Sequence, residues 1–286
     1  MKRAVHFLNS VLLWSLLLVI GACSVESGYK TYRLKNAPFP HPDRAEGYRY
    51  HNEHYSYKEH YADSSVLVYI PDSYRKRHKT DLLIFLHGWG NSKDTCNQQF
   101  QLARQVDASG KNMLLIIPEG PKFAPDSFDG KLCDKGGFKR FLDELLHHLA
   151  QDDIVRNKNI GRIVLSGHSG GYNGMAHILR YGGYTEHISD VVIFDGLYWL
   201  EEDYLNWIQQ YDGHLINIYT ENGGTKDNTE NFMSACDSLG IVYYRGKTKN
   251  LKNMPGDRIL MLYSDLGHSE IMHKRKNLLK ILKSLK

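Results

Sequence analysis

The chain has 286 residues, of which 42% are hydrophobic and 24% charged, and its formal net charge is +4. This length suits one enzyme-sized domain, and neither internal repeats nor low-complexity linkers divide it. The charge is modest and lies largely in a basic run at 75–79 and in the C-terminal segment, so nucleic acid is not an expected partner.

The N-terminal residues are typical of a targeting segment. Two basic residues precede an apolar run over 11–20, which is shorter than the roughly 20 residues that a membrane-spanning helix needs. The run ends in Ile20-Gly21-Ala22-Cys23, which resembles the lipobox of bacterial lipoproteins. The resemblance implies a lipoprotein signal peptide over 1–22 and lipidation of Cys23. The protein would then be anchored to a membrane of the bacterial cell envelope, facing the periplasm or the exterior. The alternative is an ordinary signal peptide cut near Ala22.

Residues 23–60 are expected to form an N-terminal anchor and wrap segment. The segment is rich in tyrosine and contains four histidines, at positions 41, 51, 54 and 60. Their irregular spacing and the lack of clustered carboxylates favour edge strands and a surface wrap over a metal site. We therefore expect no metal.

Residues 61–286 alternate short apolar runs with amphipathic segments, which predicts an α/β domain. The runs predict buried strands over 65–70, 82–86, 113–117, 162–166, 191–194, 215–219 and 259–263. Helical spacing of apolar residues predicts helices from Phe138 to Leu149 and from Asn173 to Tyr181. Strands and helices in series imply a mostly parallel, doubly wound sheet flanked by helices, without a large cap domain.

A nucleophile motif follows one of these strands. Gly167-His168-Ser169-Gly170-Gly171 reads G-x-S-x-G between an apolar run and a helical segment. A strand that turns sharply into a helix holds its central residue in a left-handed conformation, and flanking glycines avoid collisions there. The pattern predicts that the Ser169 hydroxyl is lifted above the sheet, with the Gly170 amide at a helix N-terminus, where negative charge is favoured.

Two further motifs lie after predicted strands. The run at 82–86 ends in His87-Gly88-Trp89-Gly90, which resembles the HG-x-G oxyanion loop of lipases and esterases, and the run at 259–263 precedes Gly267-His268-Ser269. Together with the order of serine, acid and histidine, these motifs resemble the α/β-hydrolase superfamily over nearly all of the chain after the leader.

The resemblance implies a catalytic apparatus. Ser169 would be the nucleophile and His268 the base that takes its proton. The backbone amides of Gly170 and Trp89 would hold the oxyanion. Three carboxylates are candidates for the acid: Asp195 directly follows one strand, whereas Glu221 and Asp227 follow the next strand, where superfamily members usually carry it. We predict Asp195, with Glu221 and Asp227 as alternatives.

The substrate pocket is expected at the same edge of the sheet. His87, Phe128, Tyr172 and Tyr198 each follow or flank a strand end there, and aromatic rings could receive an aromatic acyl group or sugar rings. The long segment over 118–137 is expected to wall the site.

These features predict an exported, membrane-anchored serine hydrolase. We expect a carboxylesterase that needs no cofactor and cleaves exogenous small-molecule or polysaccharide-linked esters through an acyl-enzyme intermediate. The alternatives are a serine peptidase of the same fold and a catalytically inactive lipoprotein that only binds ligands. A disulfide between Cys96 and Cys133, and the oligomeric state, stay open.

Overall fold

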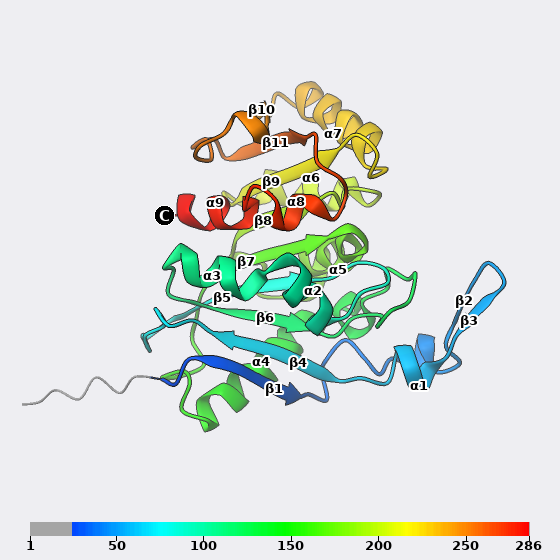
Figure 1. Ribbon diagram of the computed structural model, residues 1–286, viewed down its shortest axis with the longest axis vertical. Coiled ribbons are helices and arrows are strands. Elements are labelled where there is room, and N and C mark those ends of the chain that lie inside the picture. Colours follow the sequence, from blue (N-terminus) through cyan, green and yellow to red (C-terminus); the bar gives the residue numbers. More distant parts are fainter. Residues whose placement is uncertain (1–24, 286) are drawn as a thin grey trace, which may run out of the picture.

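A nine-stranded sheet runs through the centre of the molecule (Figure 1), in a computed structural model that describes residues 25–285. β4 is antiparallel to both of its neighbours, and the strands from β6 to β10 are parallel. The spatial order is β1 (Gly28–Arg33), β4 (Ser65–Ile70), β6 (Met113–Pro118), β5 (Thr80–Leu86), β7 (Ile160–His168), β8 (Ile188–Phe194), β9 (His214–Thr220), β11 (Ile259–Ser264) and β10 (Tyr244–Lys247).

The continuous apolar runs become strands that are covered on both faces. In β5, Leu82, Ile84 and Leu86 enter one hydrophobic cluster, whereas Leu83 and Phe85 enter the other. Successive side chains of a strand point to opposite faces of the sheet. A strand that is buried on both faces therefore needs an unbroken apolar run. The predicted α/β fold with a mostly parallel sheet is confirmed.

Helices cover the sheet in two layers. One face carries α4 (Gly137–Gln151), α5 (Tyr172–His177), α6 (Glu201–Gln210) and α7 (Lys226–Ser238). The other face, in front in Figure 1, carries α2 (Lys93–Phe100), α3 (Leu102–Ser109), α8 (Glu270–His273) and α9 (Asn277–Ser284). Short turns are η1 (Pro42–Arg44), η2 (Gly130–Cys133), η3 (Ser169–Gly171), η4 (Ile178–Gly182), η5 (Thr185–His187) and η6 (Thr248–Asn250). None of the helices in the described part of the chain is long and apolar enough to cross a bilayer.

The segment before β4 divides between the sheet and a projection. β1 is an edge strand that pairs with β4. A hairpin of β2 (Tyr48–Tyr50) and β3 (Glu53–Tyr55), followed by α1 (Tyr57–His60), projects beside the carboxyl ends of the parallel strands (Figure 1). The predicted signal peptide at 1–22 and the predicted lipidation site at Cys23 lie outside the described residues.

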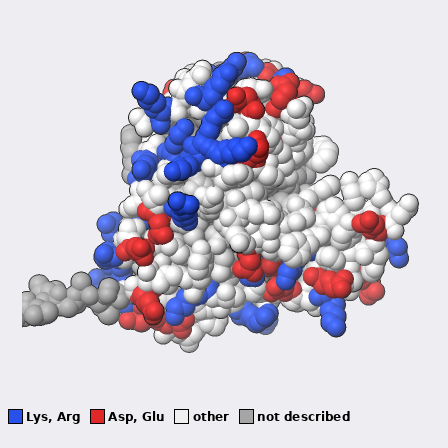
Figure 2. Space-filling view, viewed as in Figure 1, with Lys and Arg blue, Asp and Glu red and all other residues white. Residues whose placement is uncertain are grey.

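The basic C-terminal segment is the solvent face of a packed helix. Figure 2 shows Lys and Arg side chains gathered over the part of the molecule that holds α9 and β10. The opposite face of α9 is fully buried through Leu278, Ile281 and Leu282. Lys280 Nζ donates a hydrogen bond to the carbonyl of Leu251 at 2.9 Å. The basic residues of this segment therefore lie on the solvent face of an amphipathic helix.

The three cysteines of the described chain are buried and unpaired. Cys96 lies in α2, Cys133 in the turn before α4, and Cys236 in α7, and all are free thiols in the structure. Burial raises the pKa of the Cys96 thiol well above its usual value. A protonated, buried thiol is a poor nucleophile.

Candidate active site

The elbow after β7 holds Ser169 in a left-handed conformation, with φ of +53°. Two glycines make this turn possible because neighbouring atoms leave no room for a side chain. A Cβ on Gly167 would lie 2.6 Å from Met175 Sδ, and one on Gly171 would lie 2.6 Å from the carbonyl oxygen of Leu86. The serine is thus presented at the carboxyl end of β7, where the helical turn begins.

The loop after β5 packs directly on this elbow. A Cβ on Gly88 would lie 2.6 Å from Ser169 Cβ and 2.8 Å from the backbone nitrogen of Gly170. A Cβ on Gly170 would in turn lie 2.7 Å from Trp89 Cδ1. The N–H of Trp89 has no hydrogen-bond partner among residues 25–285. The structure therefore brings both predicted oxyanion donors, Trp89 and Gly170, beside Ser169.

The carboxylate that meets His268 is that of Asp195, at the end of β8. Nδ1 of His268 lies 2.7 Å from Asp195 Oδ2. The Asp195 side chain is fully buried, and it also accepts hydrogen bonds from the hydroxyls of Thr220, at 2.6 Å, and Thr225. Burial alone would raise the pKa of Asp195, but the hydrogen bonds from His268, Thr220 and Thr225 outweigh it and lower the pKa. Asp195 therefore remains charged and can orient the imidazole.

The two alternative acids lie away from this contact. Glu221 and Asp227 are exposed, and Glu221 pairs with Lys226 at 2.6 Å. The last residue of β9, Thr220, and Thr225 in the loop after it bind Asp195 instead, and neither was among the predicted site residues. The sequence held a signal for them, since both lie at or just after the end of the strand where the alternative acids were sought.

His168, the variable residue of the motif, supports the loop that carries His268. Its Nε2 lies 3.0 Å from the carbonyl oxygen of His268, and the two rings are 4.5 Å apart. Burial and the neighbouring His268 lower the pKa of His168 to about 3, so the ring is neutral and carries its proton on Nε2. Within the described chain, His268 makes no hydrogen bond to Ser169; such contacts often tighten only when substrate binds.

A small aromatic cavity opens beside Ser169. It has a volume of about 160 Å³ and is lined by Trp89, Ser127, Ser169, Gly170, Tyr172, Tyr198 and Trp199. The rings of Tyr172 and Tyr198 are 5.7 Å apart, and those of Tyr198 and Trp199 are 6.2 Å apart. Burial raises the pKa of Tyr172 to about 12, so this wall is uncharged at neutral pH. Tyr172 and Tyr198, two of the predicted pocket residues, thus line this cavity, together with Trp199 and Ser127.

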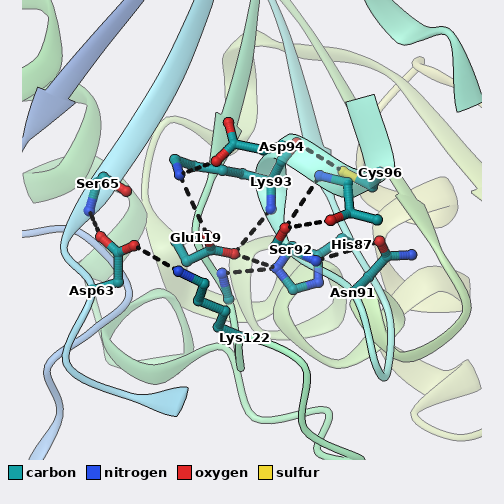
Figure 3. Close-up of polar contacts among 12 residues, drawn as sticks. Asp63, Ser65, His87, Asn91, Ser92, Lys93, Asp94, Cys96, Glu119 and Lys122 are labelled. Carbon is teal, nitrogen blue, oxygen red and sulfur yellow. Dashed lines mark hydrogen bonds and ion pairs between the residues drawn. The ribbon is translucent and has the colours of Figure 1, made fainter. Parts of the chain in front are cut away.

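Two residues predicted for the pocket lie elsewhere. His87 is turned beneath the oxyanion loop, where its side chain is 1% exposed and its Nε2 lies 3.0 Å from Glu119 Oε1 (Figure 3). Phe128 packs against His41 and the guanidinium of Arg44, whose Cζ lies 4.7 Å from its ring centroid. Both pocket assignments are wrong, because position at a strand end does not decide which way a side chain points.

No metal-binding arrangement accompanies these side chains: residues 25–285 hold no group of three or more His, Cys, Asp or Glu placed to share an ion. The chemistry that the arrangement offers is nucleophilic. A serine on a strained elbow, a histidine paired with a buried carboxylate, and two backbone donors are the parts needed for acyl transfer.

Comparisons with known proteins bear on the fold. No family model and no curated protein matches the chain. Among solved structures, the siderophore hydrolase EstA from Aspergillus nidulans is similar over 99% of this chain and 100% of its own, with TM-score 0.53 and 14% identity. The fluorophosphonate-binding serine hydrolase FphF from Staphylococcus aureus is similar over 90% of this chain and 98% of its own, with TM-score 0.52 and 10% identity.

A ferulic acid esterase is also similar, over 76% of this chain and 92% of its own, with TM-score 0.51 and 14% identity. At these identities the likeness establishes the fold alone, because one fold carries many activities. The chain has the α/β-hydrolase fold, and these three structural neighbours are by name an esterase and two hydrolases, one of them a serine hydrolase.

Proposed function

We propose that the protein is an exported, membrane-anchored carboxylesterase that cleaves exogenous esters through an acyl-enzyme intermediate. The observation that carries the proposal is the pairing of His268 with the buried carboxylate of Asp195 beside a serine held at φ of +53°. A structural serine would not need a strained backbone, and strain of this kind is kept where the surrounding structure has a use for it.

In the proposed reaction, Ser169 Oγ attacks the ester carbonyl carbon while His268 Nε2 takes its proton. Asp195 holds the Nδ1–H of His268 and stabilises the imidazolium that forms. The amides of Trp89 and Gly170 would bind the oxyanion. Collapse of the tetrahedral intermediate breaks the ester bond, and the departing alcohol takes the proton from His268. Water then repeats the sequence on the acyl-enzyme and releases the acid.

The cavity favours esters of a flat, aromatic acid. A volume of about 160 Å³, walled by Trp89, Tyr172, Tyr198 and Trp199, suits one ring better than a long alkyl chain. The likeness of the fold to a ferulic acid esterase is compatible with that choice. The alcohol side would lie toward solvent, where a small-molecule or polysaccharide-linked alcohol can be accommodated.

Labelling with a fluorophosphonate probe tests the nucleophile. The wild type should be labelled, and Ser169→Ala should abolish labelling while keeping its melting temperature. Turnover is then compared among aryl esters of acetate, butyrate, octanoate and a hydroxycinnamate, with peptide anilides in parallel. We expect the highest kcat/KM for the aromatic acid and no anilide cleavage. Cleavage of anilides alone would indicate a peptidase, and absence of both labelling and turnover would indicate a protein that only binds.

A further inference from the structure

A buried cluster of ionisable side chains lies beneath the oxyanion loop and has no part in the proposed reaction (Figure 3). It joins His87, at the end of β5, to Glu119, after β6, and to Lys93, at the start of α2. The side chains of His87 and Glu119 are each 1% exposed, and that of Lys93 is 7% exposed. Taking charges out of water is unfavourable unless their partners compensate. Such a cluster calls for a structural or functional reason.

Glu119 is held from one side and holds His87 on the other. Its Oε1 accepts a hydrogen bond from the backbone N–H of Lys93 at 2.9 Å, and its Oε2 lies 3.5 Å from Lys93 Nζ. Oε1 also lies 3.0 Å from His87 Nε2. Burial would lower the pKa of His87, but the hydrogen bond and the charge of Glu119 outweigh it and raise the pKa. The contact with Glu119 therefore fixes the position of the His87 ring.

The other nitrogen of the ring reaches the oxyanion loop itself. His87 Nδ1 lies 3.0 Å from the carbonyl oxygen of Gly88. A carbonyl oxygen can only accept, so Nδ1 carries a proton and donates it. This holds whether Nε2 donates to Glu119 or accepts from the backbone N–H of Gly120, which is also 3.0 Å away.

The carbonyl of Gly88 and the N–H of Trp89 belong to one peptide unit. Among the described residues the only cis peptide is Phe39–Pro40, so this unit is trans. In a planar trans peptide the C=O and N–H bonds point in opposite directions. A carbonyl drawn toward His87 therefore turns the Trp89 N–H away from His87. If this peptide unit were flipped, the Gly88 carbonyl oxygen would point away from His87, in the direction that the Trp89 N–H now takes. The oxyanion donor would then be lost.

We propose that His87, braced by Glu119 and Lys93, is a positioning residue that holds the Gly88–Trp89 peptide in the orientation in which its N–H stabilises the oxyanion. The inference rests on the proposed function, because an oxyanion hole matters only to an acyl-transfer enzyme. It gives a role to the polar cluster that the reaction itself leaves unused.

Two substitutions at one position separate the two nitrogens of the ring. In His87→Asn the amide nitrogen takes the place of Nδ1 and can donate to Gly88, whereas in His87→Gln it extends toward the place of Nε2 and Glu119. We expect His87→Gln to lower kcat on the order of a hundredfold with KM within threefold, as for loss of one oxyanion donor. His87→Asn should keep kcat within about tenfold of wild type.

A trifluoromethyl ketone analogue of the best ester gives a readout that a purely structural role would not move. Ser169 adds to its carbonyl carbon, His268 takes the serine proton, and the oxygen becomes an oxyanion in the hole. The inhibition constant should rise for His87→Gln by about the same factor as kcat falls. Melting temperatures are measured for every variant.

Native kcat in a folded His87→Gln would overturn the inference, as would equal losses of kcat and melting temperature in both variants. If His87→Gln does not fold, Glu119→Ala and Glu119→Gln decide. Glu119→Gln can still bridge Lys93 and His87, so only Glu119→Ala should lose kcat selectively; equal kcat in the two would refute the role. If the wild type is active and the variants have the same kcat, this inference alone is refuted. If the wild type is inactive and is not labelled, the proposed function is refuted.

Discussion

Asp195 Oδ2 accepts a hydrogen bond from His268 Nδ1 at 2.7 Å, although β9 separates their strands in the sheet. The backbone makes this reach possible, because Asp195 adopts φ of +46° and its N–H donates to the carbonyl of Ile218 in β9 at 2.7 Å. The carboxylate thus lies across the end of β9 and receives the hydroxyl of Thr220 there. β9 therefore holds the acid in place through Thr220, although the acid itself follows β8.

Replacing Asp195 with asparagine should lower kcat by a factor on the order of 10³ to 10⁴, because the neutral amide no longer selects the imidazole tautomer with its proton on Nδ1. Steady-state kinetics on the best ester measure the loss. Glu221→Gln and Asp227→Asn are the matched controls, and both should remain within twofold of wild type. If kcat were lost in Glu221→Gln but retained in Asp195→Asn, the acid would be carried by the loop after β9.

Trp199→Ala should weaken turnover of aromatic esters selectively. The ring lines the cavity yet is 65% exposed, so its removal opens the acyl pocket with little effect on the core. We expect kcat/KM to fall about five- to tenfold for a hydroxycinnamate ester, which corresponds to about 1 kcal/mol of ring contact, and to change little for an acetate ester. Leu239→Ala, another exposed apolar residue, is the control. Equal losses on both esters would contradict an aromatic acyl pocket.

Asp129→Asn should stabilise the protein above neutral pH. Burial raises the pKa of Asp129 from 3.8 to about 7, against the opposing effects of His87 and the Gly174 N–H. Between those two values the folded protein keeps a proton that the unfolded chain releases, so this group lowers the free energy of unfolding as pH rises from about 4 to about 7. Over this range the free energy of unfolding falls by at most about 4 kcal/mol through this group.

An asparagine at this position stays neutral and can still accept from the Gly174 N–H, as Asp129 Oδ2 does at 3.0 Å. The melting temperature of Asp129→Asn should therefore exceed that of the wild type by several degrees at pH 8, and the gain should shrink toward pH 5. Thermal unfolding at both pH values tests this. A difference that does not depend on pH would mean that Asp129 does not titrate in the folded protein.

Cys23→Ser should shift the protein from the membrane fraction to an uncleaved or soluble form, because the substitution removes the expected acylation site. Esterase activity of purified protein should be retained, since residue 23 precedes β1 in the chain. Mass spectrometry of the native N-terminus is the direct measurement. A mature chain that begins with an unmodified residue other than Cys23 would exclude lipidation.

The strands and the elbow could be predicted from the amino-acid sequence, because both depend on residues that are neighbours along the chain. An unbroken apolar run such as Leu82–Leu86 can be buried only between two layers, and glycines at 167 and 171 permit the turn at Ser169. Three features could be found only in the folded molecule: the distance between Asp195 and His268, the burial of His87 and the packing of Phe128. Each depends on segments far apart in sequence, such as β5 meeting β6 or the loop at 128 meeting Arg44, and a side chain's direction follows from the partners that folding brings to it.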